Sequence, residues 1–190
     1  MAQRLLTRPD MNPRSVLVAY ITRDGYSHMV ADAIAQRLRD HGLEIDVANL
    51  ELCIRYPERY DGVALACAAR FGHFADAMAS FIAEHLPALA SRPTAFLAID
   101  SSRNAAGHVD RFLRDVRWDP SLRLMLPGLK GARVRRVKAW LEDKLEAQTM
   151  THVRGPTDWV RVRALADELA SRVTMVPLAA RESFASSGRS

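Results

Sequence analysis

This chain of 190 residues lacks several features that would mark a specialised class of protein. It has only two cysteines, Cys53 and Cys67, and their separation gives neither a zinc-binding spacing nor a C-x-x-C pair. We therefore expect reduced thiols. No stretch approaches the ~20 consecutive apolar residues of a membrane-spanning helix, and Leu5 and Leu6 are too few for the apolar core of a signal peptide. These absences predict a cytoplasmic protein.

Sequence repeats and glycine-rich phosphate loops are missing as well. Neither G-x-G-x-x-G nor G-x-x-x-x-G-K-[ST] occurs, so a dinucleotide fingerprint and a P-loop are both unsupported. The one low-complexity run is the serine-rich end, residues 183–190. Hydrophobic residues make up 48% and charged residues 26% of the chain, which is typical of a single globular domain.

The charge balance favours an anionic partner. The chain has 27 Lys and Arg against 22 Asp and Glu, a net charge of +5. A basic protein of this kind suits a nucleotide, a lipid surface, an acidic metabolite or a nucleic acid, and net charge does not choose among them.

Short apolar runs alternate with helical stripes from Ser15 onward. The runs, each too short for a solitary buried helix, predict five strands at residues 16–21, 45–50, 63–67, 95–99 and 122–126. Apolar residues at three- and four-residue spacing predict helices around residues 30–38, 78–86, 109–113 and 162–173. Because mostly continuous apolar strands imply burial on both faces, we expect an α/β protein with a parallel sheet covered by helices on each side.

The expected domain boundaries follow from this pattern. Residues 1–14 and 177–190 are predicted to be flexible ends, and residues 15–176 to form the domain. Within the domain, residues 51–60 contain Pro57 and four charged residues, which predicts a short or irregular connection in place of a helix.

Ligands of open parallel sheets bind beyond the carboxyl ends of the strands, so the loops after the first, third and fourth strands are the places to look for a site. The first of these loops reads Thr22-Arg23-Asp24-Gly25-Tyr26-Ser27 and leads directly into a helix. Its hydroxyls, its glycine and the free N–H groups of a helix start suit an anion. The alternative is an ordinary turn in which Ser27 caps the helix.

The second loop, residues 68–74, combines small residues, a glycine, an arginine and two phenylalanines. Gly72 would let the backbone approach a planar ligand, with Phe71 as apolar contact and Arg70 facing an anionic or electron-rich group. The alternative is that Phe71 and Phe74 pack into the core and His73 caps the next helix. The third loop, residues 100–104, either completes the rim of a pocket or is a solvated loop.

Together these loops carry a resemblance to a known family. Residues 22–27 resemble the FMN phosphate loop of flavodoxins, and residues 69–73 are similar to the second flavin loop of menaquinone-dependent protoporphyrinogen IX dehydrogenases. Shorter similarities follow at residues 117–120 and 157–159. The resemblance implies a flavodoxin-like fold with strand order 2-1-3-4-5, a non-covalent FMN, and oxidation of a porphyrinogen with electrons passed to a quinone or another acceptor.

The resemblance also implies which residues hold FMN. The phosphate would be held by Thr22, Arg23, Asp24, Gly25, Tyr26 and Ser27, and the ring would be bordered by Ala69, Arg70, Phe71, Gly72, His73, Ser101 and Ser102. The flavin ring itself does the redox chemistry, so no acid–base residue is assigned as catalytic. No metal is expected.

A basic insertion, residues 127–150, follows the fifth predicted strand and has helical spacing. It either contacts an anionic membrane surface or porphyrin propionates, with Arg133, Arg135 and Arg136 as the substrate-binding candidates, or packs on its own domain. Residues 141–146 are too polar to bury in acyl chains, so the electron acceptor stays open.

Two other functions are weighed against this one. A flavodoxin-type electron carrier or general flavin reductase would use the same loops, but such carriers are usually acidic. A nucleic-acid-binding module is disfavoured because Trp140 is the only aromatic residue in the insertion. Self-association of the chain stays open.

Overall fold

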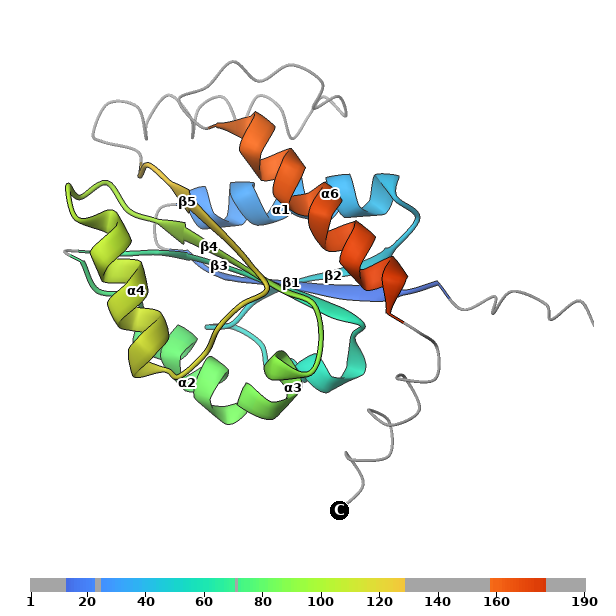
Figure 1. Ribbon diagram of the computed structural model, residues 1–190, viewed down its shortest axis with the longest axis horizontal. Helices are drawn as coiled ribbons and strands as arrows, with labels where there is room; N and C mark the ends of the chain where they lie inside the picture. Colours follow the sequence, from blue (N-terminus) through green and yellow to red (C-terminus); the bar gives the residue numbers. More distant parts are fainter. Residues whose placement is uncertain (1–12, 23–24, 71, 129–157, 177–190) are drawn as a thin grey trace, which may run out of the picture.

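The computed structural model describes residues 13–22, 25–70, 72–128 and 158–176. Five parallel strands form one sheet in the order β2-β1-β3-β4-β5, with helices on both faces (Figure 1). This arrangement confirms the predicted α/β class and the strand order 2-1-3-4-5. The elements are β1 (Ser15–Ile21), α1 (Tyr26–Asp40), β2 (Glu44–Asn49), η1 (Pro57–Arg59), β3 (Gly62–Ala68), α2 (Asp76–Glu84), α3 (Leu86–Ala90), β4 (Thr94–Ile99), α4 (Ala105–Asp115), β5 (Leu122–Leu126) and α6 (Trp159–Met175).

The period of two along each strand builds a core on either side of the sheet. Val16 and Val18 of β1 face the layer formed by α1 and α6, whereas Leu17 and Ala19 face the layer of α2, α3 and α4. Figure 1 shows these helices above and below the sheet. The three central strands are buried on both faces, as predicted. The edge strands β2 and β5 are only partly buried, because each has a neighbour on one side alone.

Two connections follow directly from proline. Pro57 starts the 3₁₀ turn η1 in the irregular connection after β2, as expected for residues 51–60. The helix expected around residues 78–86 is broken at His85 into α2 and α3, and Pro87 lies in the first turn of α3. Proline is tolerated there because the first N–H groups of a helix have no intrahelical partner.

The ends of the fold are fixed by polar contacts. Asp158 caps α6 by accepting a hydrogen bond from the Arg161 N–H at 3.2 Å. Arg14, which the sequence places in the N-terminal segment, donates to the carbonyls of Val173 and Val176. The packed part of the chain therefore includes residue 14. Residues 129–150 of the basic insertion, with Arg133, Arg135 and Arg136, lie outside the described residues.

The helices in the described ranges include none with the length and apolar character needed to cross a bilayer.

Candidate functional site

The first loop turns sharply at Gly25, which has a φ of +85° and is the N-cap of α1. Its N–H donates to Thr22 Oγ1 at 2.9 Å, and its carbonyl accepts the first helical hydrogen bond from the Met29 N–H. Accepting this bond leaves the Thr22 O–H free as a donor. The interpretation of Ser27 as the N-cap is wrong, because the helix starts one residue earlier, at Tyr26. Arg23 and Asp24 lie outside the described residues.

Ser27 is the most informative residue of this loop. It is fully buried in the first turn of α1, and its Oγ has no hydrogen-bond partner among the described residues. A buried hydroxyl without a partner is destabilising by about 1–3 kcal/mol, so such groups normally have one. The N–H groups of the same turn lack intrahelical acceptors and form the positive end of the helix dipole. A bound anion at this helix start would satisfy both.

The second loop is a tight hairpin closed by two backbone hydrogen bonds. The Arg70 N–H donates to the His73 carbonyl at 2.8 Å, and the His73 N–H donates back to the Arg70 carbonyl at 3.0 Å. Gly72 makes the turn with a φ of +79°, which is a conformation that favours glycine. Phe71 lies outside the described residues.

Of the alternative roles considered for this loop, the structure confirms one and contradicts another. Phe74 is buried against Phe96 and Phe112, with ring centroids at 5.6 and 4.7 Å, so its core role is confirmed. The capping role of His73 is wrong, because α2 begins at Asp76 with Ala75 as its N-cap. The hairpin hydrogen bonds hold the His73 backbone two residues before that cap.

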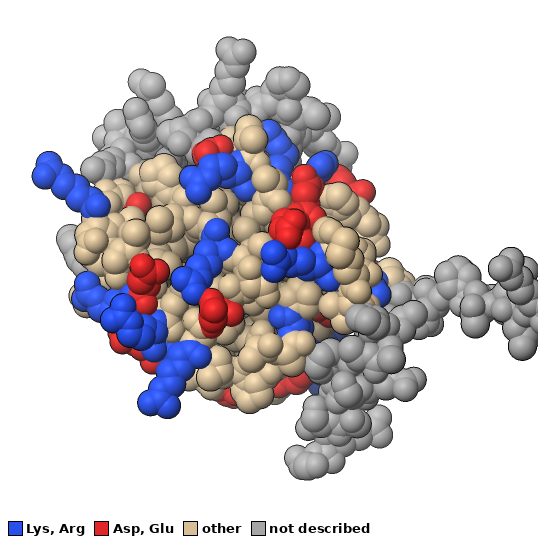
Figure 2. Space-filling view, in the orientation of Figure 1, with Lys and Arg blue, Asp and Glu red and all other residues tan. Residues whose placement is uncertain are grey.

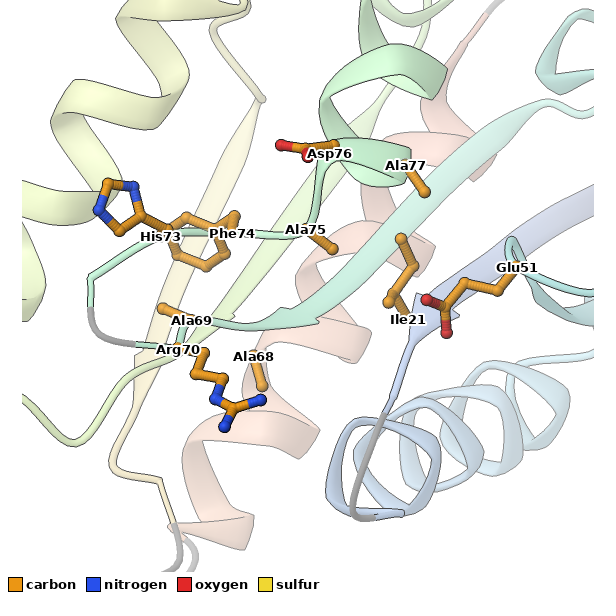
Figure 3. Close-up of a pocket in the computed structure, with 10 residues that line it drawn as sticks. All are labelled: Ile21, Glu51, Ala68, Ala69, Arg70, His73, Phe74, Ala75, Asp76 and Ala77. Carbon is orange, nitrogen blue, oxygen red and sulfur yellow. The ribbon is translucent and has the colours of Figure 1, made fainter.

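A pocket of about 620 Å³ opens beside this hairpin, at the carboxyl ends of β1 and β3 (Figure 3). This is where strand order reverses in the sheet, which is the usual ligand position in such folds. Arg70 and Glu51 bring opposite charges to its wall, and Glu51 is a residue that sequence reasoning missed. The lining residues are Ile21, Glu51, Ala68, Ala69, Arg70, His73, Phe74, Ala75, Asp76 and Ala77.

The third loop lies next to the second. The Ala69 N–H donates to the Ile99 carbonyl at 2.7 Å, and the Asp100 N–H donates to the Leu126 carbonyl at 3.0 Å. Ser101 and Ser102 are exposed at this rim. The three loops predicted from sequence therefore share one edge of the sheet, and register pairs Ile21 of β1 with Cys67 of β3 at that edge.

Cys67 offers this edge no reactive thiol. Burial raises the pKa of its side chain to about 11, so it stays protonated at neutral pH. Cys53 and Cys67 are both free, in agreement with the expected reduced thiols. Over the part of the chain that the structure describes, no cluster of three His, Cys, Asp or Glu side chains could hold a metal ion.

The chain is similar to known proteins both in sequence and in structure. The chain is 28% identical to the protoporphyrinogen IX dehydrogenase [quinone] of Escherichia coli strain K12 over 174 residues, which covers 81% of this chain and 93% of that protein. It is 26% identical to the Leishmania major protein of the same name, covering 85% and 77% of the two chains. In structure it is similar to a flavodoxin from the domain Archaea, with a TM-score of 0.54, 16% identity and coverage of 84% and 99%.

The family assignment rests on most of the chain. A family model described as a flavodoxin domain matches residues 17–155, which include all three loops. The archaeal flavodoxin supports the same fold independently of sequence. Membership of this family implies a flavin cofactor. The chain belongs to the flavodoxin-domain family.

Proposed function

We propose that this protein is an FMN-dependent oxidoreductase that oxidises protoporphyrinogen IX to protoporphyrin IX and passes the electrons to a quinone or another acceptor. The two named dehydrogenases support the substrate and the acceptor, since the similarity extends over most of each chain. The observation that carries the flavin half is the buried Ser27 hydroxyl at the start of α1, which has no hydrogen-bond partner among the residues that the structure describes. It is the group that a cofactor phosphate would satisfy.

The described residues fit FMN. Thr22 and Ser27 offer hydroxyls and Gly25 leaves the turn open, since a Cβ at residue 25 would meet no atom within 4 Å. The ring is proposed to lie against residues 69–73, Ser101 and Ser102, beside the pocket. When bound, FMN supplies the ring that accepts electrons. The chain's residues hold the phosphate, orient the ring and shape access to it.

The anionic carboxylates of a porphyrinogen need cationic partners. Arg70 at the pocket wall is one candidate within the described residues, and Arg133, Arg135 and Arg136 of the insertion are the others. Arginine suits carboxylates because its planar fork donates two parallel hydrogen bonds. On the face shown in Figure 2, basic and acidic side chains are interspersed over the described surface. Individual arginines are therefore better candidates there than a uniformly basic patch.

A purified sample mixed with FMN provides the first test. We expect a flavin absorption spectrum with one FMN per chain, and oxidation of protoporphyrinogen IX with a soluble quinone, without detergent. The variant with Arg133, Arg135 and Arg136 changed to Ala should keep its flavin spectrum and lose turnover, and the wild-type rate should fall as salt rises.

The outcomes separate the competing functions. A triple variant as fast as wild type at low salt would remove the insertion from substrate binding. A flavin-loaded protein that leaves protoporphyrinogen IX unchanged yet exchanges electrons with other donors would make it an electron carrier or a general flavin reductase. Failure to bind any flavin would reject the proposal.

A further inference from the structure

An aspartate–histidine pair stands at the carboxyl end of β4. Asp100 is buried, and its Oδ2 lies 2.8 Å from Nδ1 of His108 on α4. The other carboxylate oxygen, Oδ1, accepts a hydrogen bond from the Ser102 N–H at 2.8 Å, and Ser102 Oγ lies 3.1 Å from the same imidazole nitrogen. The carboxylate is thus held by its own loop and in turn fixes the ring of His108.

The proton arrangement of the pair follows from the charge of Asp100. Burial raises the pKa of this carboxyl group, but the hydrogen bonds from Ser102 and His108 outweigh burial and hold the pKa below its usual value. An ionised carboxylate only accepts hydrogen bonds, so Nδ1 of His108 carries the proton. In the neutral imidazole the lone pair is then on Nε2, where it can act as a base.

The backbone of Gly72 packs closely against the ring of His108. A Cβ at residue 72 would lie 2.6 Å from Cε1 and 2.7 Å from Nε2 of His108. Any side chain there would fill the space beside the imidazole edge. Two features therefore favour glycine at residue 72. Its φ of +79° is one, and the closeness of the His108 ring is the other.

The position of His108 connects the two loops that border the proposed ring site. Its imidazole contacts residue 72 of the second loop and Ser102 of the third. The side chain is 16% exposed, and across the described ranges Nε2 has no hydrogen-bond partner. A buried acid orienting a partly exposed histidine whose far nitrogen is free is the usual arrangement of a general base.

We propose that His108 is the proton acceptor of this site and that Asp100 is its positioning residue, an inference that rests on the proposed function. Oxidation of protoporphyrinogen IX to protoporphyrin IX removes six hydrogens in three two-electron steps, four from the bridging carbons and two from pyrrole nitrogens. In each step a hydride would leave a bridging carbon for the flavin, and a proton would leave a pyrrole nitrogen, or in one step the remaining bridging carbon, for a base. Nε2 takes this proton, Asp100 stabilises the resulting imidazolium, and the proton then passes to water at the exposed edge.

Other charged groups flank the histidine but do not replace Asp100. Arg70 and His73 belong to the hairpin that faces it, and Arg103, Asp110 and Arg111 lie within five residues of it in the sequence. Among the described residues, the side chains that pair with the imidazole of His108 are those of Asp100 and Ser102, and Asp100 is the charged one. Substitution of Asp100 should therefore disturb the orientation of the His108 ring more than substitution of any of these groups.

The first test compares His108→Gln with the matched control His41→Gln. His41 also pairs with an aspartate, its Nε2 lying 2.7 Å from Asp167 Oδ1, but it follows α1 at the opposite edge of the sheet. We expect His108→Gln to bind FMN with an unchanged dissociation constant and to oxidise protoporphyrinogen IX roughly 10²–10⁴-fold more slowly. His41→Gln should be as fast as wild type.

The second test follows protonation directly and does not need turnover. Imidazole NMR of the apoprotein and of the FMN complex should show the proton of neutral His108 on Nδ1, and Asp100→Asn should weaken that preference, because an amide can donate as well as accept a hydrogen bond. In the loaded enzyme Asp100→Asn should slow oxidation of protoporphyrinogen IX and leave the dissociation constant of FMN unchanged. This variant keeps the test decisive if His108→Gln does not fold.

The two proposals fail in distinguishable ways. If wild type oxidises protoporphyrinogen IX and His108→Gln matches its rate, or Asp100→Asn changes neither the imidazole tautomer nor the rate, the role of His108 is overturned and the proposed function stands. If wild type binds no flavin, both fall together.

Discussion

The hydroxyl of Ser27 should have opposite effects on the stability of the ligand-free protein and on its affinity for FMN. Its buried Oγ is unsatisfied among the described residues, which destabilises the protein without ligand. The hydroxyl contributes favourably only when an acceptor occupies the helix start. Gly25, two residues earlier, supplies the backbone conformation that opens the same loop. These two residues therefore predict different effects on stability and on FMN affinity.

Replacing Ser27 by Ala should weaken FMN binding by about tenfold, since one charge-assisted hydrogen bond is lost. The free energy of unfolding of the apoprotein should not fall, because the variant removes a buried polar group that has no hydrogen-bond partner in the described part of the chain. Chemical denaturation of the apoprotein and fluorescence titration with FMN measure the two effects. Ser80→Ala, at an exposed position of α2, is the control and should change neither. A destabilised apoprotein would show that Ser27 has a structural partner.

Replacing Gly25 by Ala should lower both the free energy of unfolding and the affinity for FMN. The expected loss is about 1–2 kcal/mol of unfolding free energy, because the alanine must adopt a φ of +85°. Gly42→Ala is a matched control, since Gly42 has a φ of +78° and, like Gly25, has no atom within 4 Å of the added Cβ. Both variants should lose similar stability, but only Gly25→Ala should lose FMN affinity. Equal FMN affinity in the two variants would argue against the proposal that residues 22–27 hold the FMN phosphate.

At the scale of elements, α1 and α6 are joined by one carboxylate. Asp167 of α6 accepts from Arg37 Nε at 2.7 Å and lies 2.7 Å from His41 Nε2. The hydrogen bond from Arg37, followed by that from His41, holds the pKa of Asp167 below its usual value. A carboxyl group with a lowered pKa stabilises the fold above its unfolded pKa, and this contribution disappears as pH falls through the folded pKa.

Asp167→Asn should therefore destabilise the protein modestly at pH 7. The difference from wild type should shrink as the pH falls from about 4, near the unfolded pKa, down through the lower pKa of the folded protein. Denaturation curves across this range measure the effect. Glu168→Gln is the control, because Glu168 pairs with Arg172 inside α6 and joins no second helix. A constant difference between pH 7 and pH 3 would contradict the linkage.

At the scale of the whole molecule, a ligand that binds only the folded state stabilises all of it. FMN at 100 times its dissociation constant should raise the free energy of unfolding by about 2.7 kcal/mol. Riboflavin at the same concentration should raise it far less, because it has the ring and lacks the phosphate that the start of α1 would hold. Thermal denaturation with each ligand provides the comparison. Equal stabilisation would place the binding energy in the ring alone.

The sequence by itself determined the architecture. Apolar strands of five or six residues separated by helical stripes leave few packings other than a parallel sheet between helices, because both strand faces must be buried. It also predicted which loops lie together, since parallel connections bring the ends of β1, β3 and β4 to one edge. Local chemistry, the glycines at 25 and 72 and the hydroxyls beside them, was visible without coordinates.

Only the tertiary structure decided how side chains from distant segments meet. Glu51 reaches the pocket across the irregular connection after β2, whose path no periodicity specifies. His108 pairs with Asp100 eight residues away and touches Gly72 across the sheet edge, so its role depends on the rotation of α4. The unsatisfied state of Ser27 depends on every neighbour that surrounds it. Sequence patterns record which face a residue occupies, whereas contacts between loops are set by the packing of whole elements.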